Sequence, residues 1–174
     1  IPANLAICLH PEYIYSLVNA GGEYYLIANE LVDSFARETG LSDYQETKKF
    51  IGKELEGIKC RHPFMGWESP LILGEHVTLD TGTGCVHTAP GHGIEDFEVG
   101  MKYGLKVFSP VTNIGTFTEE AGKYAGMKLT DANPVIIKDL ENSGHLMKSG
   151  KIIHQYPHCW RCKNPVTFRA TEQW

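Results

Sequence analysis

One short segment constrains this chain more than any other: Thr81–Asp96, with the sequence TGTGCVHTAPGHGIED. Its glycines can adopt positive φ and let the backbone approach a ligand closely. Two imidazoles and two carboxylates lie in or just after the turn, on His87, His92, Glu95 and Asp96. A turn of this composition usually does more than connect two elements. The segment therefore predicts a functional site.

Size and charge limit the kind of protein that this chain can be. With 174 residues, 42% of them hydrophobic, it can bury one substantial core, which predicts a single domain. Sixteen Lys and Arg against 21 Asp and Glu give a net charge of −5. That balance argues against a dedicated electrostatic binder of nucleic acid but leaves a local basic patch open. No apolar run reaches membrane-spanning length and no leader opens the chain, so we expect a soluble protein without a membrane partner.

The cysteines and the chain ends indicate where such a protein works. Five cysteines are odd in number and thinly spread, which favours a reduced, cytoplasmic setting over a disulfide framework. The chain opens on Ile1 without an initiator Met and stops at Trp174 without an obvious terminal cap. We therefore expect it to be a fragment of a longer polypeptide.

Short strands dominate the local patterns. Apolar runs separated by turn-forming residues predict strands. The predicted strands are Asn4–Leu9, Tyr13–Asn19, Glu23–Ala28, Tyr44–Ile51, Gly57–Arg61, Leu71–Leu73, His76–Leu79, Val107–Val111 and Lys151–Tyr156. The predicted helices are Asn29–Glu38 with Asn29 as cap, Glu95–Tyr103, and a helix from the Asn133-Pro134 pair to Ser143. Segments His62–Pro70 and Thr112–Thr130 are expected to be irregular. The fold class is therefore α+β and strand-rich, with a barrel-like β-sheet core and about three short helices.

Asp96 and His87 each have two interpretations. Asp96 lies in the first turn of a predicted helix, where exposed N–H groups favour a negative charge. It either recognises a ligand ammonium or merely complements the helix dipole. His87 follows the apolar Cys85-Val86 pair and so lies near a strand end, where rigid scaffolds place chemistry. It either positions a water or a proton or is a hydrogen-bonded structural histidine, and the glycine-rich setting beside Asp96 favours function.

His92, between Gly91 and Gly93, extends this site to a candidate metal centre. With His87 and Asp96 it would form an open His/His/Asp set suited to metal-dependent hydrolysis. No H-E-x-x-H spacing supports that set, and no Walker or G-x-G-x-x-G pattern predicts phosphate binding. A metal-dependent hydrolase is therefore an alternative interpretation.

The sequence of the glycine-rich segment resembles that of one family. GTGCVHTAPGHGIEDFEVGMKYGL, at Gly82–Leu105, resembles the editing domain of isoleucyl-tRNA synthetase, a class I synthetase. The resemblance extends to IPANLAI at Ile1–Ile7, HPFMGWESPLILGEHVTLDTGTG at His62–Gly84 and YPHCWRCKNPVTFRATEQW at Tyr156–Trp174. It covers essentially the whole chain. Valyl and leucyl relatives share the general layout, whereas VHTAPGHG is typical of the isoleucyl branch.

The resemblance implies a proofreading hydrolase. Its substrates would be valine wrongly esterified to tRNA(Ile) and valyl-adenylate, and its partners would be that tRNA and the catalytic body of the same polypeptide. One methylene in an apolar pocket is worth only about 1–3 kcal/mol, a limit for which isoleucyl-tRNA synthetases are themselves the standard example. A second pocket that admits valine and blocks isoleucine removes the error. Editing would need no cofactor, whereas ATP and magnesium would belong to the absent catalytic body.

The resemblance also implies roles for single residues. Asp96 matches the aspartate that binds the substrate α-ammonium, and His87 matches the histidine that helps to recognise the substrate and supports hydrolysis. These two are the predicted catalytic residues. Asn4 matches an asparagine at the pocket edge. Ala89 and the backbone of Gly82, Thr83 and Gly84 are predicted to help form the small pocket wall.

The predicted reaction is attack by water on an ester carbonyl, in which positioning and electrostatics supply most of the rate. We expect no Ser or Cys nucleophile, and Cys85 is expected to pack rather than react. The family has a threonine-rich segment immediately before the position of Ile1, which this chain lacks. Because the resemblance gives those hydroxyls a part in holding substrate and water, we expect weak or no deacylation from the chain alone.

Cys159 and Cys162 form a single C-x-x-C. Structural zinc needs two further ligands, for which His154 and His158 are candidates. In the resembling family, a second C-x-x-C upstream of the editing insertion completes the site. We therefore predict half of a zinc site, completed in the full-length protein. Two incidental free thiols are the alternative, and no thioredoxin-like pattern indicates a redox pair.

We divide the chain into an editing domain, residues 1–156, and a C-terminal connector, residues 157–174, which returns to the catalytic body and carries the half-site. The connector also holds side chains suited to stacking on tRNA and contacting its phosphates. They are His158, Trp160, Arg161, Lys163 and Arg169. A non-catalytic tRNA-binding module is therefore the third interpretation.

Overall fold

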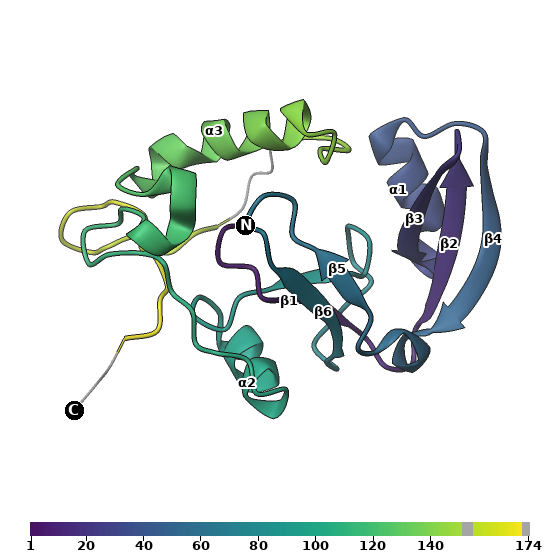
Figure 1. Cartoon of the computed structure of the whole chain (residues 1–174), viewed down its shortest axis with the longest axis horizontal. Helices are drawn as coiled ribbons and strands as arrows, with labels where there is room; N and C mark the ends of the chain where they lie inside the picture. The colour runs from purple at the N-terminus through teal and green to yellow at the C-terminus, as the bar shows by residue number, and fades with distance from the viewer. Residues whose placement is uncertain (151–154, 172–174) are drawn as a thin grey trace.

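Two β-sheets and three α-helices make up the described part of the chain (Figure 1). The structure is a computed structural model that describes residues 1–150 and 155–171. The strands are β1 (Ala6–Leu9), β2 (Ile14–Ala20), β3 (Glu23–Ala28), β4 (Tyr44–Ile51), β5 (Lys59–Arg61), β6 (Glu68–Leu73) and β7 (Val86–Thr88). The α-helices are α1 (Val32–Thr39), α2 (Ile94–Lys102) and α3 (Leu129–Asn142), and the 3-10 helices are η1 (Asn29–Leu31), η2 (Gly52–Leu55) and η3 (Glu119–Tyr124). The predicted α+β class and the three short helices are confirmed.

The strands form two separate open sheets. One has the order β5-β6-β1-β7, in which β1 and β6 run parallel and the other neighbours run antiparallel. The other has the order β3-β2-β4 and is antiparallel. In Figure 1 this three-stranded sheet stands with α1 at one end of the molecule, while β1, β5 and β6 occupy the middle. Within the described residues the sheets do not close into a barrel, because the strands divide between these two groups.

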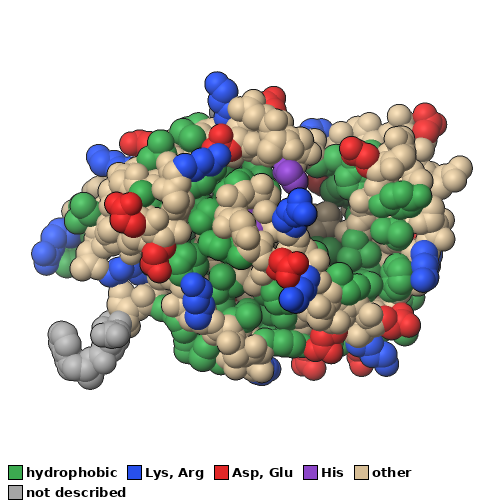
Figure 2. All heavy atoms as spheres, viewed as in Figure 1, with side chains coloured by type: hydrophobic (Ala, Val, Ile, Leu, Met, Phe, Trp, Pro, Cys, Tyr) green, Lys and Arg blue, Asp and Glu red, His purple; other side chains and the backbone are tan. Residues whose placement is uncertain are grey.

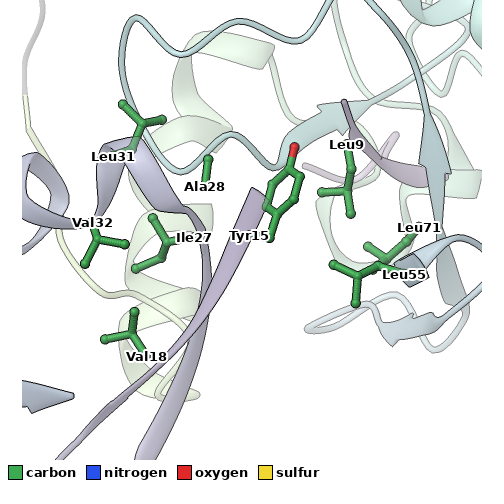
Figure 3. Close-up of a cluster of buried hydrophobic side chains, with 9 residues drawn as sticks. All are labelled: Leu9, Tyr15, Val18, Ile27, Ala28, Leu31, Val32, Leu55 and Leu71. Carbon is green, nitrogen blue, oxygen red and sulfur yellow. The ribbon is translucent and has the colours of Figure 1, made fainter. Parts of the chain in front are cut away.

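Tyr15 on β2 joins the two sheets. Its side chain is fully buried and lies between Leu9 and Ala28 in the main hydrophobic cluster (Figure 3). Its hydroxyl donates to the Gly84 carbonyl and accepts from the His10 N–H, both at 2.9 Å. Burial raises the pKa of this hydroxyl to about 12. A buried tyrosine with both hydrogen bonds made contributes packing and also fixes the loops that it reaches.

A second core lies under α3. Ala132, Ile136 and Leu140, spaced four apart, form the buried stripe of this helix. Because Ala132 belongs to the stripe, α3 begins at Leu129, about one turn earlier than predicted, and Pro134 lies inside the helix. Tertiary burial of an apolar face outweighs the local cap-and-proline signal, since packing supplies most of a helix's stability.

Two predicted strands are wrong. His76–Leu79 is a turn followed by irregular chain, and Val107–Val111 contributes one isolated bridge. Their apolar character has another cause, because Val77 and Phe108 are buried and anchor these loops in the core. An apolar run alone does not distinguish such anchors from a paired strand.

Smaller differences concern element ends. β6 begins at Glu68, inside the segment predicted to be irregular. Asn29 does not cap α1, because its side-chain oxygen accepts the Ser16 hydroxyl at 3.0 Å and η1 leads into the helix. The predicted strand Lys151–Tyr156, with the candidate ligand His154, lies largely outside the described residues.

Across the described residues, every helix is too short or too polar to cross a bilayer. On the face shown in Figure 2, basic and acidic side chains are interspersed rather than separated by sign.

Candidate functional site

His87 lies in the middle of β7, at the edge of the four-stranded sheet. β7 pairs antiparallel with β1, and Ile7 lies opposite His87. The chain then turns through residues 89–93, where the His92 N–H donates to the Ala89 carbonyl at 2.8 Å, and enters α2. A strand and a helix therefore hold the two ends of this turn, as the sequence predicts.

A cavity of about 740 Å³ lies beside His87 and Ala89. Its other walls include Ala3 near the N-terminus, Ile136 on α3 and residues 164–167 of the C-terminal segment. Cavities of several hundred Å³ with apolar walls and a few polar groups are typical of small-ligand sites. The structure thus brings three residues of the predicted site, His87, Ala89 and the candidate metal ligand His92, to one cavity.

The His87 ring is tied to Asn4, another predicted site residue. Asn4 Nδ2 lies 2.7 Å from His87 Nδ1. The ring reaches solvent, but protein surrounds it on most sides, and this desolvation lowers the pKa of His87 to about 4. The charge of Asp96 opposes this shift. His87 is therefore uncharged at neutral pH.

Asp96 lies in the first turn of α2, as predicted. Its Oδ2 accepts the Ala89 N–H at 2.9 Å, so the carboxylate reaches back across the turn. Asp96 does not line the 740 Å³ cavity but stands behind Ala89, which does. Gly93 leaves it room, since a Cβ there would lie 3.1 Å from the Asp96 carboxylate. The negative charge nevertheless acts on His87.

The other end of the glycine-rich segment packs away from this cavity. The Thr83 carbonyl accepts the Ala28 N–H at 2.8 Å, and the Gly84 carbonyl accepts the Tyr15 hydroxyl at 2.9 Å. A Cβ on Gly84 would lie 2.6 Å from the Ala28 Cβ. Gly82, Thr83 and Gly84 do not line the 740 Å³ cavity, and their part in a small pocket wall stays a prediction. These residues fasten the loop before β7 to the three-stranded sheet.

His92 does not join His87 and Asp96 around a metal ion. Its Nδ1 lies 2.9 Å from the Phe168 carbonyl oxygen and therefore donates to it. The Asn4 amide occupies Nδ1 of His87. In residues 1–150 and 155–171, no three His, Cys, Asp or Glu side chains are grouped to hold a metal ion. The structure gives the metal-dependent alternative no support there.

The C-terminal segment crosses the glycine-rich turn, which the sequence did not predict. The Ala170 N–H donates to the Gly91 carbonyl at 2.7 Å. The Arg169 guanidinium donates to the Val111 carbonyl at 2.9 Å and to the Asn113 side chain. Arg169, grouped in the sequence with tRNA-contacting side chains, is thus engaged inside the domain. Most of these contacts use backbone groups, for which residue types give no signal.

The thiol of Cys159, the first cysteine of the C-x-x-C, lies in a different environment from that of Cys85. The Cys159 carbonyl accepts the Lys163 N–H at 2.8 Å in a tight turn. The backbone N–H groups of Cys162 and Arg161 lower the pKa of the Cys159 thiol, an environment that suits a metal-bound thiolate. Burial instead raises the pKa of Cys85 to about 12, in agreement with its expected packing role.

Two residues beside Asn4 were not identified from the sequence. Ser69 Oγ donates to Asn4 Oδ1 at 2.6 Å, and Trp67 Nε1 donates to the Asn4 carbonyl at 3.0 Å. Both lie in the segment HPFMGWESP, which belongs to the family resemblance, but residue order does not show what they contact.

Comparison with known proteins places this site in a family. The sequence model of the family described as "Leucyl-tRNA synthetase, editing domain" matches residues 25–149. Similar curated proteins include the isoleucine--tRNA ligases of Petrotoga mobilis, 59% identical, and of Fervidobacterium nodosum and Moorella thermoacetica, each 57% identical. Each similarity covers 100% of this chain and 19% of the relative. The chain thus spans about a fifth of the length of these proteins.

A solved structure shares the fold. It is described as "The crystal structure of GlLeuRS-CP1", and it matches with a TM-score of 0.65 over 90% of this chain and 82% of that one. At 15% sequence identity this likeness concerns the fold alone. The family match, by contrast, extends over more than half of the chain, and the similar proteins along its whole length are isoleucine--tRNA ligases. The chain therefore belongs to the editing-domain family of these synthetases, which confirms the resemblance inferred from Gly82–Leu105.

Proposed function

We propose that this domain proofreads aminoacylation by hydrolysing valine esterified to tRNA(Ile), with valyl-adenylate as a second substrate. Membership of the editing-domain family and the full-length similarity to isoleucine--tRNA ligases support the proposal. The observation that carries it is the cavity of about 740 Å³ beside His87 and Ala89. Its volume allows for an amino acid joined to the terminal nucleoside of a tRNA rather than for valine alone.

The proposed selectivity is steric. Isoleucine exceeds valine by one methylene, which an attractive pocket distinguishes by only about 1–3 kcal/mol. A pocket wall that sterically excludes the isoleucine side chain provides the remaining discrimination between valine and isoleucine. Ala89, buried and rigidly held between β7 and the Asp96 carboxylate, supplies a small side chain on such a wall.

The proposed roles of His87 and Asp96 follow from the charge that each side chain carries. Neutral His87 offers a polar ring edge for the ester or for the attacking water. Asp96, which stands behind Ala89 and not in the cavity wall, supplies from there the negative charge that attracts the α-ammonium of the aminoacyl group. The Ala89 N–H occupies one of about four acceptor positions on that carboxylate. Water then adds to the ester carbonyl, and the bond to the ribose oxygen breaks as that oxygen takes up a proton.

The test is hydrolysis of valyl-tRNA(Ile) and isoleucyl-tRNA(Ile), both by this chain and by the longer polypeptide that carries it. We expect the valyl ester to be cleaved faster. Asp96→Asn keeps an acceptor for the Ala89 N–H but removes the charge, so it should lower the rate about 10- to 100-fold without loss of folding. Asp96→Ala serves as comparison, because it leaves a backbone N–H unpaired at a cost of about 1–3 kcal/mol.

Two outcomes would contradict the proposal. Equal hydrolysis of both esters by the longer polypeptide would remove the proofreading role. An unchanged rate in Asp96→Asn would remove Asp96 as the ammonium partner. Binding of tRNA without turnover in the longer polypeptide would instead favour a non-catalytic module.

We further propose that residues 157–174 connect the editing domain, residues 1–156, to the catalytic body. Cys159 and Cys162 would supply two thiolates of a structural zinc site whose remaining ligands belong to that body. The lowered pKa of Cys159 suits this role. Zinc would stabilise the connection, and no step of the hydrolysis is assigned to it.

A further inference from the structure

Hydrogen bonds link three side chains in series, from Ser69 on the four-stranded sheet through Asn4 to His87. Ser69 on β6 is 2% exposed, and its Oγ donates to Asn4 Oδ1 at 2.6 Å. Asn4 in turn approaches His87 Nδ1 with its Nδ2 at 2.7 Å. Asn4, His87 and Ser69 also line one smaller cavity of about 290 Å³ on this side of the ring.

The orientation of the Asn4 amide is determined by its neighbours. Its Nδ2 also lies 2.9 Å from the Ala6 carbonyl oxygen, which can only accept. Nδ2 must therefore be the amide nitrogen, and its two hydrogens are used by Ala6 and His87. The Ser69 hydroxyl on the opposite side satisfies Oδ1. The Trp67 indole holds the Asn4 backbone carbonyl at 3.0 Å, which limits movement of the whole residue.

This orientation determines where His87 carries its proton. An amide nitrogen can only donate, so Nδ1 of His87 must be the acceptor. A neutral imidazole that accepts at one nitrogen carries its proton on the other. His87 is therefore the Nε2–H tautomer. Protonation of Nδ1 would set two donors against each other, which agrees with the low pKa of this ring.

We propose that Ser69 is a positioning residue that, through the side chain of Asn4, holds His87 in the tautomer with its proton on Nε2. The inference rests on the proposed function in taking His87 as the histidine that meets the substrate. It makes His87 a hydrogen-bond donor to the ester or to the water, and not the base that removes a proton. Asn4 acts through His87, since both of its donor hydrogens are used inside the protein.

Asn4→Asp is the sharpest perturbation. The aspartate has nearly the same shape but replaces the donor beside Nδ1 by an acceptor. We expect the His87 proton to appear on Nδ1 and the pKa of His87 to rise above its low value, since a nearby carboxylate favours the charged ring. The measurement is the nitrogen chemical shift of ¹⁵N-histidine-labelled chain across a pH titration, with His87 assigned by comparison with His87→Gln.

Ser69→Ala tests the residue of this hydrogen-bonded series that is farthest from His87. With Oδ1 unpaired, the Asn4 amide can rotate, and we expect a mixture of both His87 tautomers and about a tenfold loss of deacylation in the longer polypeptide. Ser16→Ala is the control, because Ser16 is also fully buried but lies in the other sheet, where its hydroxyl is 2.7 Å from Glu46 Oε2 and 3.0 Å from Asn29 Oδ1. The control should leave the His87 nitrogen shifts and the deacylation rate unchanged.

The spectra decide the inference independently of activity. Nitrogen shifts showing the His87 proton on Nδ1 in the unmodified chain would overturn it, as would an unchanged tautomer in both Asn4→Asp and Ser69→Ala. A loss of stability in Ser69→Ala without any change in the His87 nitrogens would reduce Ser69 to a structural role. If the tautomer behaves as expected while valyl-tRNA(Ile) is not hydrolysed, the proposed function fails and the positioning stands.

Discussion

The two ends of the glycine-rich segment look alike in sequence and serve different purposes. Before β7, Gly82 and Gly84 have φ of +81° and +70°, conformations that other residues adopt at a cost. After β7, Gly91 and Gly93 lie outside this region, and their lack of a Cβ matters because of close neighbours. A Cβ on Gly91 would lie 2.2 Å from the Phe108 carbonyl oxygen.

The glycine pair before β7 therefore serves the scaffold, and the pair after β7 belongs to the candidate site. The first pair fastens the loop to the three-stranded sheet through the Tyr15 hydroxyl and the Ala28 N–H. The second pair lets the turn between His87 and Asp96 lie close to two neighbours: the Phe108 carbonyl beside Gly91 and the Asp96 carboxylate beside Gly93. Substitutions of Gly82 and Gly84 should therefore change stability, whereas substitution of Gly93, whose near neighbour is the Asp96 side chain, should change hydrolysis.

Gly84→Ala should give the largest effect. The alanine would combine an unfavourable φ, at about 1–2 kcal/mol, with overpacking against the Ala28 Cβ at 2.6 Å, at about 1–3 kcal/mol. We expect the free energy of unfolding to fall by about 2–5 kcal/mol in chemical denaturation. The deacylation rate per folded molecule should remain unchanged, and a selective loss of rate would place Gly84 in the site after all.

Gly93→Ala should show the opposite pattern. Gly93 precedes α2 in extended conformation, which alanine adopts freely, but its Cβ would lie 3.1 Å from the Asp96 carboxylate. That side chain must shift, and its hydrogen bond to the Ala89 N–H is disturbed. We expect about a tenfold lower rate of valyl-tRNA(Ile) hydrolysis, with stability reduced by about 1 kcal/mol or less. A large loss of stability with an unchanged rate would break the comparison.

How much of this follows from the sequence depends on the range of the interaction. Local signals succeed: β1 to β4 lie close to the segments predicted to be strands, and Gly40 ends α1 in the left-handed conformation. The first-turn position of Asp96 is also a local property and is confirmed. The resemblance led to the family, but it did not show which of its glycines face the cavity.

The sequence does not reveal contacts between distant segments. Ser69 and Asn4 lie far apart in sequence, and each residue type alone is unremarkable, so their hydrogen bond emerges only when β6 pairs with β1. The Ala170 contact to Gly91 joins backbone groups, which every residue carries. The early start of α3 depends on burial of Ala132 against a core built from other segments.

Gly82→Ala should give the smallest effect and isolates one cause within the first pair. Gly82 has φ of +81°, but a Cβ there would meet no atom within 4 Å. Only the backbone penalty applies, so we expect a loss of about 1–2 kcal/mol in the free energy of unfolding and no change in hydrolysis. The difference between Gly82→Ala and Gly84→Ala then measures the contact with Ala28. Equal losses in both variants would mean that backbone conformation alone, and not close approach to β3, requires glycine before β7.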